Sequence, residues 1–396
     1  MLSDHKPVCA ELSVKVRLIE RAMHRRSFED ISGQIRRVEA QGAAPEIYLE
    51  ASFLELGDVY YRTVASTTLR VANVGQGLAF LRFTSKLGEL VPFRRWLRVD
   101  PAFALLMPGE STEFRVSAFV DRLTARELCA GFEVLEETLV LRLEGGAEHY
   151  VPVFGHYASK AFGTPLELLS ARHSSQAARL GIPAEVWRLV DAVIGRGLAD
   201  GGGASELFPP AETALPPDVP VDDQTAAVLR CLDAGSEFPP SVPRPALVSA
   251  MMAFLSALPE PVVPVTAVTA VESELAAHRA TGERARIKWG RRRGLGERFL
   301  RALSPAQHNT FLYVAGFLRE VAQAGRPAGL RTGPLALFAC DSLFFPDTPW
   351  LGSENTSTST NTIVGASDRS IDTSTSWQDH REVFRVVLAS FLSATR

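Results

Sequence analysis

Few residues of this chain have types and spacings that could do chemistry. Asp4 and His5 are adjacent near the N-terminus, inside the hexapeptide Ser3-Asp4-His5-Lys6-Pro7-Val8. A neighbouring carboxylate and imidazole are a candidate for catalysis, although this dipeptide is common by chance. Whether Asp4 and His5 could be catalytic therefore depends on the secondary-structure elements that would position them.

A basic segment is the second candidate. Residues 279–301 hold nine Arg or Lys against two Glu, and Trp289 lies among them. Clustered arginines with a tryptophan could meet anionic lipid headgroups, at about 1 kcal/mol per basic residue near the surface. A solvated loop is the alternative. The chain's net charge is −3 and nothing else supports a nucleic-acid site, so we expect no nucleic acid as a partner.

The cysteines do not indicate a metal site. Cys9, Cys129, Cys231 and Cys340 lie far apart without a CxxC pair, which favours reduced thiols in a cytosolic protein and argues against zinc or a disulfide framework. The longest apolar stretch, 246–258, is interrupted by serines and is too short to cross a bilayer. The first residues include Asp4, His5 and Lys6 where a signal peptide needs an apolar segment, so we expect a soluble intracellular chain.

The length of 396 residues predicts two or three domains. Residues 46–157 contain short runs with period two, such as 114–120, separated by turn signals such as Pro108-Gly109-Glu110. About seven such strands predict an all-β, immunoglobulin-like sandwich whose core holds Leu139, Leu141 and Leu143.

From residue 183 the apolar period becomes helical, which predicts an all-α bundle over 183–396. Residues 13–45 are expected to be a charged linker with room for a helical turn, and 158–182 a second linker. The bundle would carry the basic loop 279–301 and a disordered Ser/Thr-rich loop at 352–376. Its helices are expected at 185–196, 222–232, 244–258, 296–303, 305–324, 335–344 and 377–393.

The N-terminal hexapeptide resembles the closing motif of the inositol polyphosphate 5-phosphatase catalytic domain, and residues 1–12 would be its remnant. In that family the histidine contacts the scissile phosphate and the aspartate belongs to the same cluster, which implies these roles for His5 and Asp4. The family's Mg²⁺-binding Asn and Glu lie far upstream, so we expect no cofactor and no phosphatase activity in this chain alone. Mg²⁺ is implied only for an intact parent, and the initial Met is expected to be a gene-model start.

Motifs in the β region occur in the order Trp96-Leu97-Arg98-Val99, Leu106-Met107-Pro108-Gly109, Leu139-Val140-Leu141 and Gly155-His156-Tyr157. This order resembles the ASH domain of the type II and oculocerebrorenal-syndrome group of 5-phosphatases. The resemblance implies a surface for Rab GTPases, in which an aromatic residue of the last strand takes part. The matching position is Tyr150, for which a role in the core or in an edge strand is the alternative.

The helical half resembles a Rho GTPase-activating (RhoGAP) domain. Leu258-Pro259-Glu260-Pro261 matches its LPEP signature, and 311–320 matches the helix that follows. The position of the family's arginine finger, which is worth about 10³–10⁵ in rate, matches Pro209. The family's lysine and asparagine match Met252 and Asp341. Proline has neither charge nor donor, so the resemblance implies a RhoGAP fold without catalysis.

Trp187 matches a tryptophan that binds short Phe-and-His-motif peptides of endocytic adaptors in the same group; a buried core role is the alternative.

Three functions remain open. The first is a non-catalytic module that binds Rab and Rho/Rac-type GTPases and adaptors in membrane trafficking. The second is a fragment of an active phosphoinositide 5-phosphatase. The third is an active RhoGAP whose arginine comes from elsewhere, with Arg230 and Arg244 as candidates. We expect a cytoplasmic protein held on endosomal or Golgi membranes by its partners.

Overall fold

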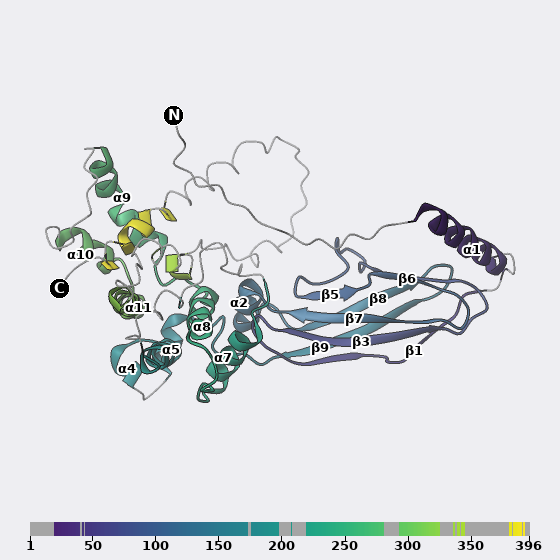
Figure 1. Cartoon of the computed structure of the whole chain (residues 1–396), viewed down its shortest axis with the longest axis horizontal. Helices are drawn as coiled ribbons and strands as arrows, with labels where there is room; N and C mark the ends of the chain where they lie inside the picture. The colour runs from purple at the N-terminus through teal and green to yellow at the C-terminus, as the bar shows by residue number, and fades with distance from the viewer. Residues whose placement is uncertain are drawn as a thin grey trace.

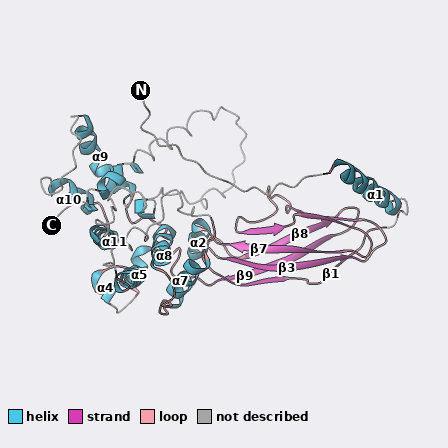
Figure 2. Ribbon diagram, viewed as in Figure 1, coloured by secondary structure: helices cyan, strands magenta, loops and turns pink. Residues whose placement is uncertain are grey.

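The computed structural model describes residues 20–39, 42, 44–172, 176–197, 207, 219–280, 293–324, 336, 339–340, 342–344, 380–381, 383–389 and 391–392. A β-sandwich forms one part, with helices gathered at one of its ends and helix α1 (Arg21–Glu39) at the opposite end (Figure 1). Strands and helices separate along the molecule (Figure 2), which confirms the predicted all-β sandwich followed by an all-α region.

Nine strands lie within residues 47–157, all of which the structure describes. They are β1 (Ile47–Leu49), β2 (Leu54–Val59), β3 (Val64–Asn73), β4 (Ala79–Thr84), β5 (Leu97–Asp100), β6 (Phe103–Leu106), β7 (Ser111–Phe119), β8 (Glu136–Leu143) and β9 (Glu148–Tyr157). One sheet has the order β1-β3-β7-β5 and the other β2-β9-β8-β4-β6. Neighbouring strands are antiparallel, except that β2 runs parallel to β9.

Alternation along the strands builds the sandwich core. Leu139, Leu141 and Leu143 of β8 are buried, as predicted. Phe83 of β4 meets Phe114 of β7 edge to face, with ring centroids 5.1 Å apart, and so joins the two sheets.

Helix α2 (Arg122–Ala130) lies between β7 and β8, where the sequence pattern predicts no helix. Asp121 caps its start, because a carboxylate oxygen accepts a 2.7 Å hydrogen bond from the Thr124 backbone N–H. Gly131 ends it in the left-handed conformation, at φ 78°. The helix is too short to show a clear 3.6-residue period, so only its caps mark it in the sequence.

The helical region contains most of the expected helices. Their bounds are α3 (Leu166–Ala171), α4 (Gln176–Leu180), α5 (Ala184–Gly195), α7 (Asp223–Ala234), α8 (Arg244–Ala257), α9 (Val265–Ala280), α10 (Arg293–Arg301) and α11 (Pro305–Ala324). Helical positions between 336 and 343 and between 380 and 392 fall where two more were expected.

Three helices lie where the sequence predicted linkers. Helix α1 occupies most of the expected linker 13–45, and α3 and α4 lie within 158–182. Helix α10 overlaps the predicted helix 296–303 and begins three residues earlier, inside the predicted basic loop 279–301, whereas the sequence did not predict α9. Charged or short helices bury few side chains, so their apolar pattern is weak. Residues 352–376, the expected disordered loop, lie outside the described residues.

Aromatic rings join the sandwich to the helices. Tyr61 stacks on Phe162 at a centroid distance of 4.7 Å, and Phe162 meets Phe254 of α8 edge to face at 5.9 Å. The Tyr61 hydroxyl also donates a 3.4 Å hydrogen bond to the Ala253 carbonyl. All three rings are fully buried, so a single continuous core spans the junction.

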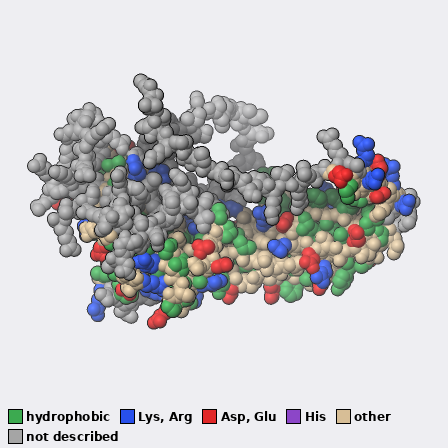
Figure 3. All heavy atoms as spheres, in the orientation of Figure 1, with side chains coloured by type: hydrophobic (Ala, Val, Ile, Leu, Met, Phe, Trp, Pro, Cys, Tyr) green, Lys and Arg blue, Asp and Glu red, His purple; other side chains and the backbone are tan. Residues whose placement is uncertain are grey.

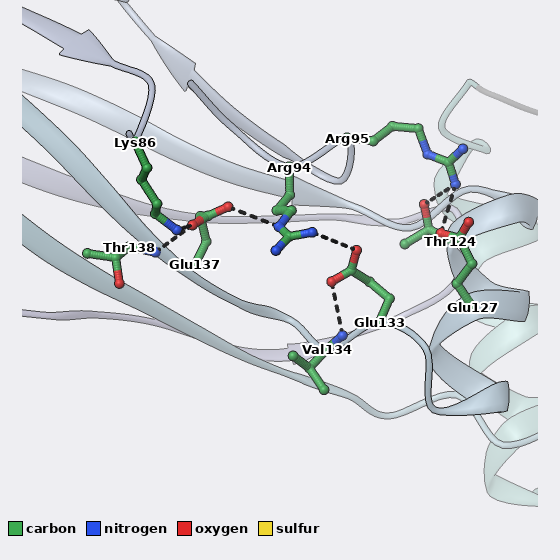
Figure 4. A network of polar contacts seen from close by, with 9 residues as sticks. All are labelled: Lys86, Arg94, Arg95, Thr124, Glu127, Glu133, Val134, Glu137 and Thr138. Carbon is green, nitrogen blue, oxygen red and sulfur yellow. Dashed lines mark hydrogen bonds and ion pairs between the residues drawn. The ribbon is translucent and has the colours of Figure 1, made fainter. Parts of the chain in front are cut away.

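A polar network ties the loop between β4 and β5 to the rest of the sandwich (Figure 4). The Glu137 side chain is only 2% exposed, and its carboxylate pairs with Lys86 and with Arg94, the latter at 3.4 Å. Arg95 reaches Thr124 and Glu127 of α2 at 3.1 and 3.4 Å. The charged residues of this loop therefore serve the fold, because their partners lie within the sandwich itself.

Candidate functional site

The predicted site residues do not converge on one place. Asp4, His5, Pro209 and Asp341 lie outside the described residues, so their predicted roles stay predictions. Tyr150 lies in the sandwich, whereas Trp187 and Met252 lie in different helices of the other half. The described residues thus form separate surfaces and no catalytic constellation.

Tyr150 points out of the five-stranded sheet. It lies on β9 opposite Val140 of β8, and it is 62% exposed. Its hydroxyl donates a 3.1 Å hydrogen bond to a Glu148 carboxylate oxygen, and that bond raises the pKa of Tyr150. The structure thus excludes a core role for this side chain and leaves its aromatic ring open to a partner.

Other apolar side chains, which were not among the predicted site residues, share the outer face of this sheet. Phe80 of β4 and Phe103 of β6 lie 6.3 Å apart between ring centroids, with Leu105 beside them on β6; all three are exposed. Ion pairs on this sheet join Arg82 of β4 to Glu144 just after β8, and Arg142 of β8 to Glu148 of β9. The sequence Ala79-Phe80-Leu81 does indicate these exposed apolar side chains, because consecutive apolar residues in a strand place apolar groups on both faces of the sheet.

Trp187 is half-buried on α5, so part of its indole reaches the surface. The next residue, Arg188, lies over the Phe238 ring at 4.9 Å and donates to the carbonyls of Cys231 and Ser236. Burial lowers the pKa of the Arg188 guanidinium. These bonds fix α5, which carries Trp187, against the end of α7.

The LPEP-like turn has a structural role in this chain. Leu258 and Pro261 are buried, and the Pro261 carbonyl accepts a 3.0 Å hydrogen bond from the Gln307 side chain of α11. Met252, which matches the family's lysine, is buried in α8. A buried thioether in the helix core offers neither charge nor a donor to a nucleotide.

The two arginines considered as replacements for a finger differ in their surroundings. Arg244 donates to the Gly197 carbonyl and is therefore held within the protein. Arg230 is exposed on α7. Within the described ranges, no three His, Cys, Asp or Glu side chains lie close enough to hold a metal ion. None of the helices described is long and apolar enough to span a bilayer.

Comparison with known proteins assigns the β region to the same domain family that its sequence motifs resemble. Residues 49–157 match the family described as the ASH domain of OCRL-like inositol polyphosphate 5-phosphatases. The type II inositol 1,4,5-trisphosphate 5-phosphatase of Mus musculus is 25% identical over a match of 286 residues, and the match covers 66% of this chain and 27% of that enzyme. The match is longer than the whole of 1–157, so the similarity continues into the helices. It spans about a quarter of the mouse enzyme.

Solved structures show looser similarity. Human Rho GTPase activating protein 15 aligns with a TM-score of 0.36 and 14% identity, covering 60% of this chain and 93% of that one. WR4, an MSP family member from C. elegans, aligns with a TM-score of 0.20 and 11% identity, over 28% of this chain and 97% of its own. Scores this low support no statement about function.

The chain therefore contains an OCRL-like ASH domain followed by a helical region, and it is distantly homologous to the type II inositol 5-phosphatase.

Proposed function

We propose that this chain is a non-catalytic binding module for GTPases and adaptors, built from an ASH sandwich and a RhoGAP-like bundle that has lost its catalysis. The observation that carries the proposal is the exposed ring of Tyr150 on the outer face of the ASH sheet. Its position matches the aromatic contact for Rab GTPases in the resembling family. A rigid aromatic side chain on a flat sheet is a typical anchor for a protein partner.

The absence of GTPase activation is the second part of the proposal. Pro209 matches the arginine finger in sequence, Met252 is buried, and Arg244 is held by the Gly197 carbonyl. Contact with Rho/Rac-type GTPases would then be binding without turnover. A GTP hydrolysis assay with a Rho-type GTPase should show the intrinsic rate only, and a rise of about 10³-fold or more would contradict this.

Tyr150→Asp tests the Rab surface. A carboxylate in place of the ring removes the apolar area and repels Glu148, so the affinity for GTP-loaded Rab proteins should fall about tenfold or more. Tyr48→Asp is the matched control, because Tyr48 is an equally exposed tyrosine at the edge of the other sheet. Equal affinity for both variants, measured by calorimetry across a panel of Rab proteins, would remove this surface from the proposal.

The adaptor surface is centred on Trp187. Its half-exposed indole on α5 suits a short Phe-and-His-motif peptide, which would lay its aromatic side chain against the helix. Trp187→Ala should weaken binding of such a peptide, and the same peptide with its Phe replaced by Ala should bind neither protein. Unchanged binding to Trp187→Ala, in a variant with native circular dichroism, would contradict this role.

The alternative function is that of a 5-phosphatase fragment, which the homology to the mouse enzyme favours. Asp4 and His5 would then belong to an intact parent that uses Mg²⁺ to dephosphorylate phosphoinositides. Phosphate release from a 5-phosphorylated phosphoinositide by residues 1–396 should stay at background. A Mg²⁺-dependent rate would overturn the non-catalytic proposal.

We further propose that the basic segment 284–301 makes weak contact with anionic membranes, and that endosomal or Golgi partners recruit the protein.

A further inference from the structure

Helix α1 presents an apolar stripe that the described residues of the protein leave largely exposed. Phe28 is 66% exposed and Ile31 is 56% exposed, and Ile35 is half-buried. At 3.6 residues per turn, these three positions fall within a sector of about 60° around the helix axis. Side chains of this size rarely remain exposed together unless they meet a partner.

The remainder of the helix is rich in arginine. Exposed guanidinium groups come from Arg25, Arg26, Arg36 and Arg37. The acidic residues among the described side chains of α1 are Glu29 and Asp30, so this surface is positive by two charges. A helix with an apolar stripe and a basic polar face fits the boundary between lipid headgroups and acyl chains.

The position of α1 leaves that surface accessible. The helix lies at the end of the sandwich remote from the helical region (Figure 1), and blue and red side chains mark it at the same end of the space-filling view (Figure 3). A single helix of 19 residues is marginal in water, so burial of its stripe would add the stability that it lacks.

We propose that α1 lies flat on an anionic lipid bilayer, with Phe28, Ile31 and Ile35 below the headgroups and with Arg25 and Arg36 at headgroup level. Charge complementarity favours a membrane over an uncharged protein groove, because Arg25 and Arg36 flank one side of the apolar stripe. Arg26 and Arg37 add positive charge on the far side of the helix. This contact uses other side chains than the Tyr150 surface and does not depend on GTPase binding. It would hold the ASH sandwich at the membrane by its end rather than by its sheets.

The test is co-sedimentation of the full chain with vesicles of phosphatidylcholine containing about 30% phosphatidylserine. Phe28→Asp places a carboxylate in the stripe and should reduce the bound fraction about tenfold. Met23→Asp is the matched control: Met23 is a 64% exposed apolar residue of the same helix, about 140° away from Phe28 around its axis. Met23→Asp makes the same change of charge and should retain most of the binding.

Salt and lipid charge complete the design. Binding should fall as ionic strength rises and should be weak on pure phosphatidylcholine, because the arginines require anionic headgroups. Equal loss in both variants would mean that net charge, for example through 284–301, carries the binding, and would overturn the proposal. Absence of vesicle binding by the wild-type chain would also overturn it. So would a Phe28→Asp effect confined to GTPase capture, which would identify a protein as the partner of α1.

Discussion

The rings of Tyr61 and Phe162 stack face to face at 4.7 Å, with an angle of 14° between their planes. Tyr61 precedes β3 of the sandwich, and Phe162 lies between β9 and α3, so this pair connects the two halves of the chain. Burial raises the pKa of the Tyr61 phenol to about 12, which keeps it protonated as the hydrogen-bond donor to Ala253. The junction is thus a packed core and not a flexible tether.

Phe162→Ala should lower the free energy of unfolding by about 3–5 kcal/mol, because it removes a fully buried ring that contacts both Tyr61 and Phe254. Urea unfolding followed by fluorescence measures the change. Phe132→Ala is the control, since Phe132 is largely exposed, and it should cost less than about 1 kcal/mol. Similar losses for both variants would show that the junction contributes little.

Asp233 gives the junction a dependence on pH. Its carboxylate accepts hydrogen bonds from the Lys160 and Ala161 backbone N–H groups at 2.9 and 3.1 Å, and burial raises its pKa. The contribution of Asp233 to stability is therefore fully present below the ordinary carboxyl pKa and is lost as the pH rises through the raised value.

Asp233→Asn keeps an acceptor oxygen without the charge, so its stability relative to wild type should improve as the pH rises from about 4 to about 7. Asp233→Ala loses both hydrogen bonds and should be destabilised throughout that range. Urea midpoints of the three proteins at each pH measure these differences. A difference between Asp233→Asn and wild type that stays constant with pH would contradict the raised pKa.

Gly163 makes a close approach that only glycine permits. Its φ is +89°, and a Cβ added there would lie 2.4 Å from the Ala125 carbonyl oxygen of α2. Gly163→Ala should therefore cost more than the ~1–2 kcal/mol of left-handed backbone strain alone. Gly88→Ala is the control, because Gly88 has the same φ of +89° with no atom within 4 Å of the added Cβ. Equal thermal shifts would mean that α2 moves away without cost.

The sequence predicted the sandwich because its strands bury alternate residues, as β8 does with Leu139 and Leu141. It predicted α11 over 305–324 because long buried helices repeat their apolar residues every three or four positions. Helix α2 could have been found from Asp121, Thr124 and Gly131, whose types suit the two caps of a short helix.

The candidate surfaces were predicted only in part. Tyr150 was placed through a family resemblance, and its exposure depends on the register that sets it opposite Val140. The pairing of Phe80 with Phe103 needs β4 and β6 to be neighbours although β5 lies between them in sequence. No local pattern contains that information. The sequence did not predict the apolar stripe on α1, because the many arginines of this segment are typical of a charged linker.

The continuous core beneath Phe162 has a practical consequence for dissecting this protein into pieces. A cut between residues 157 and 183 would leave Tyr61 on one product and Phe254 on the other, and Phe162 would remain with only one of them. Both products would then expose apolar surface that is buried in the intact chain, and such surface promotes aggregation. Pull-down experiments with truncated chains could therefore detect non-specific association instead of specific binding. The binding surfaces of this chain are better located by point substitutions in the full chain.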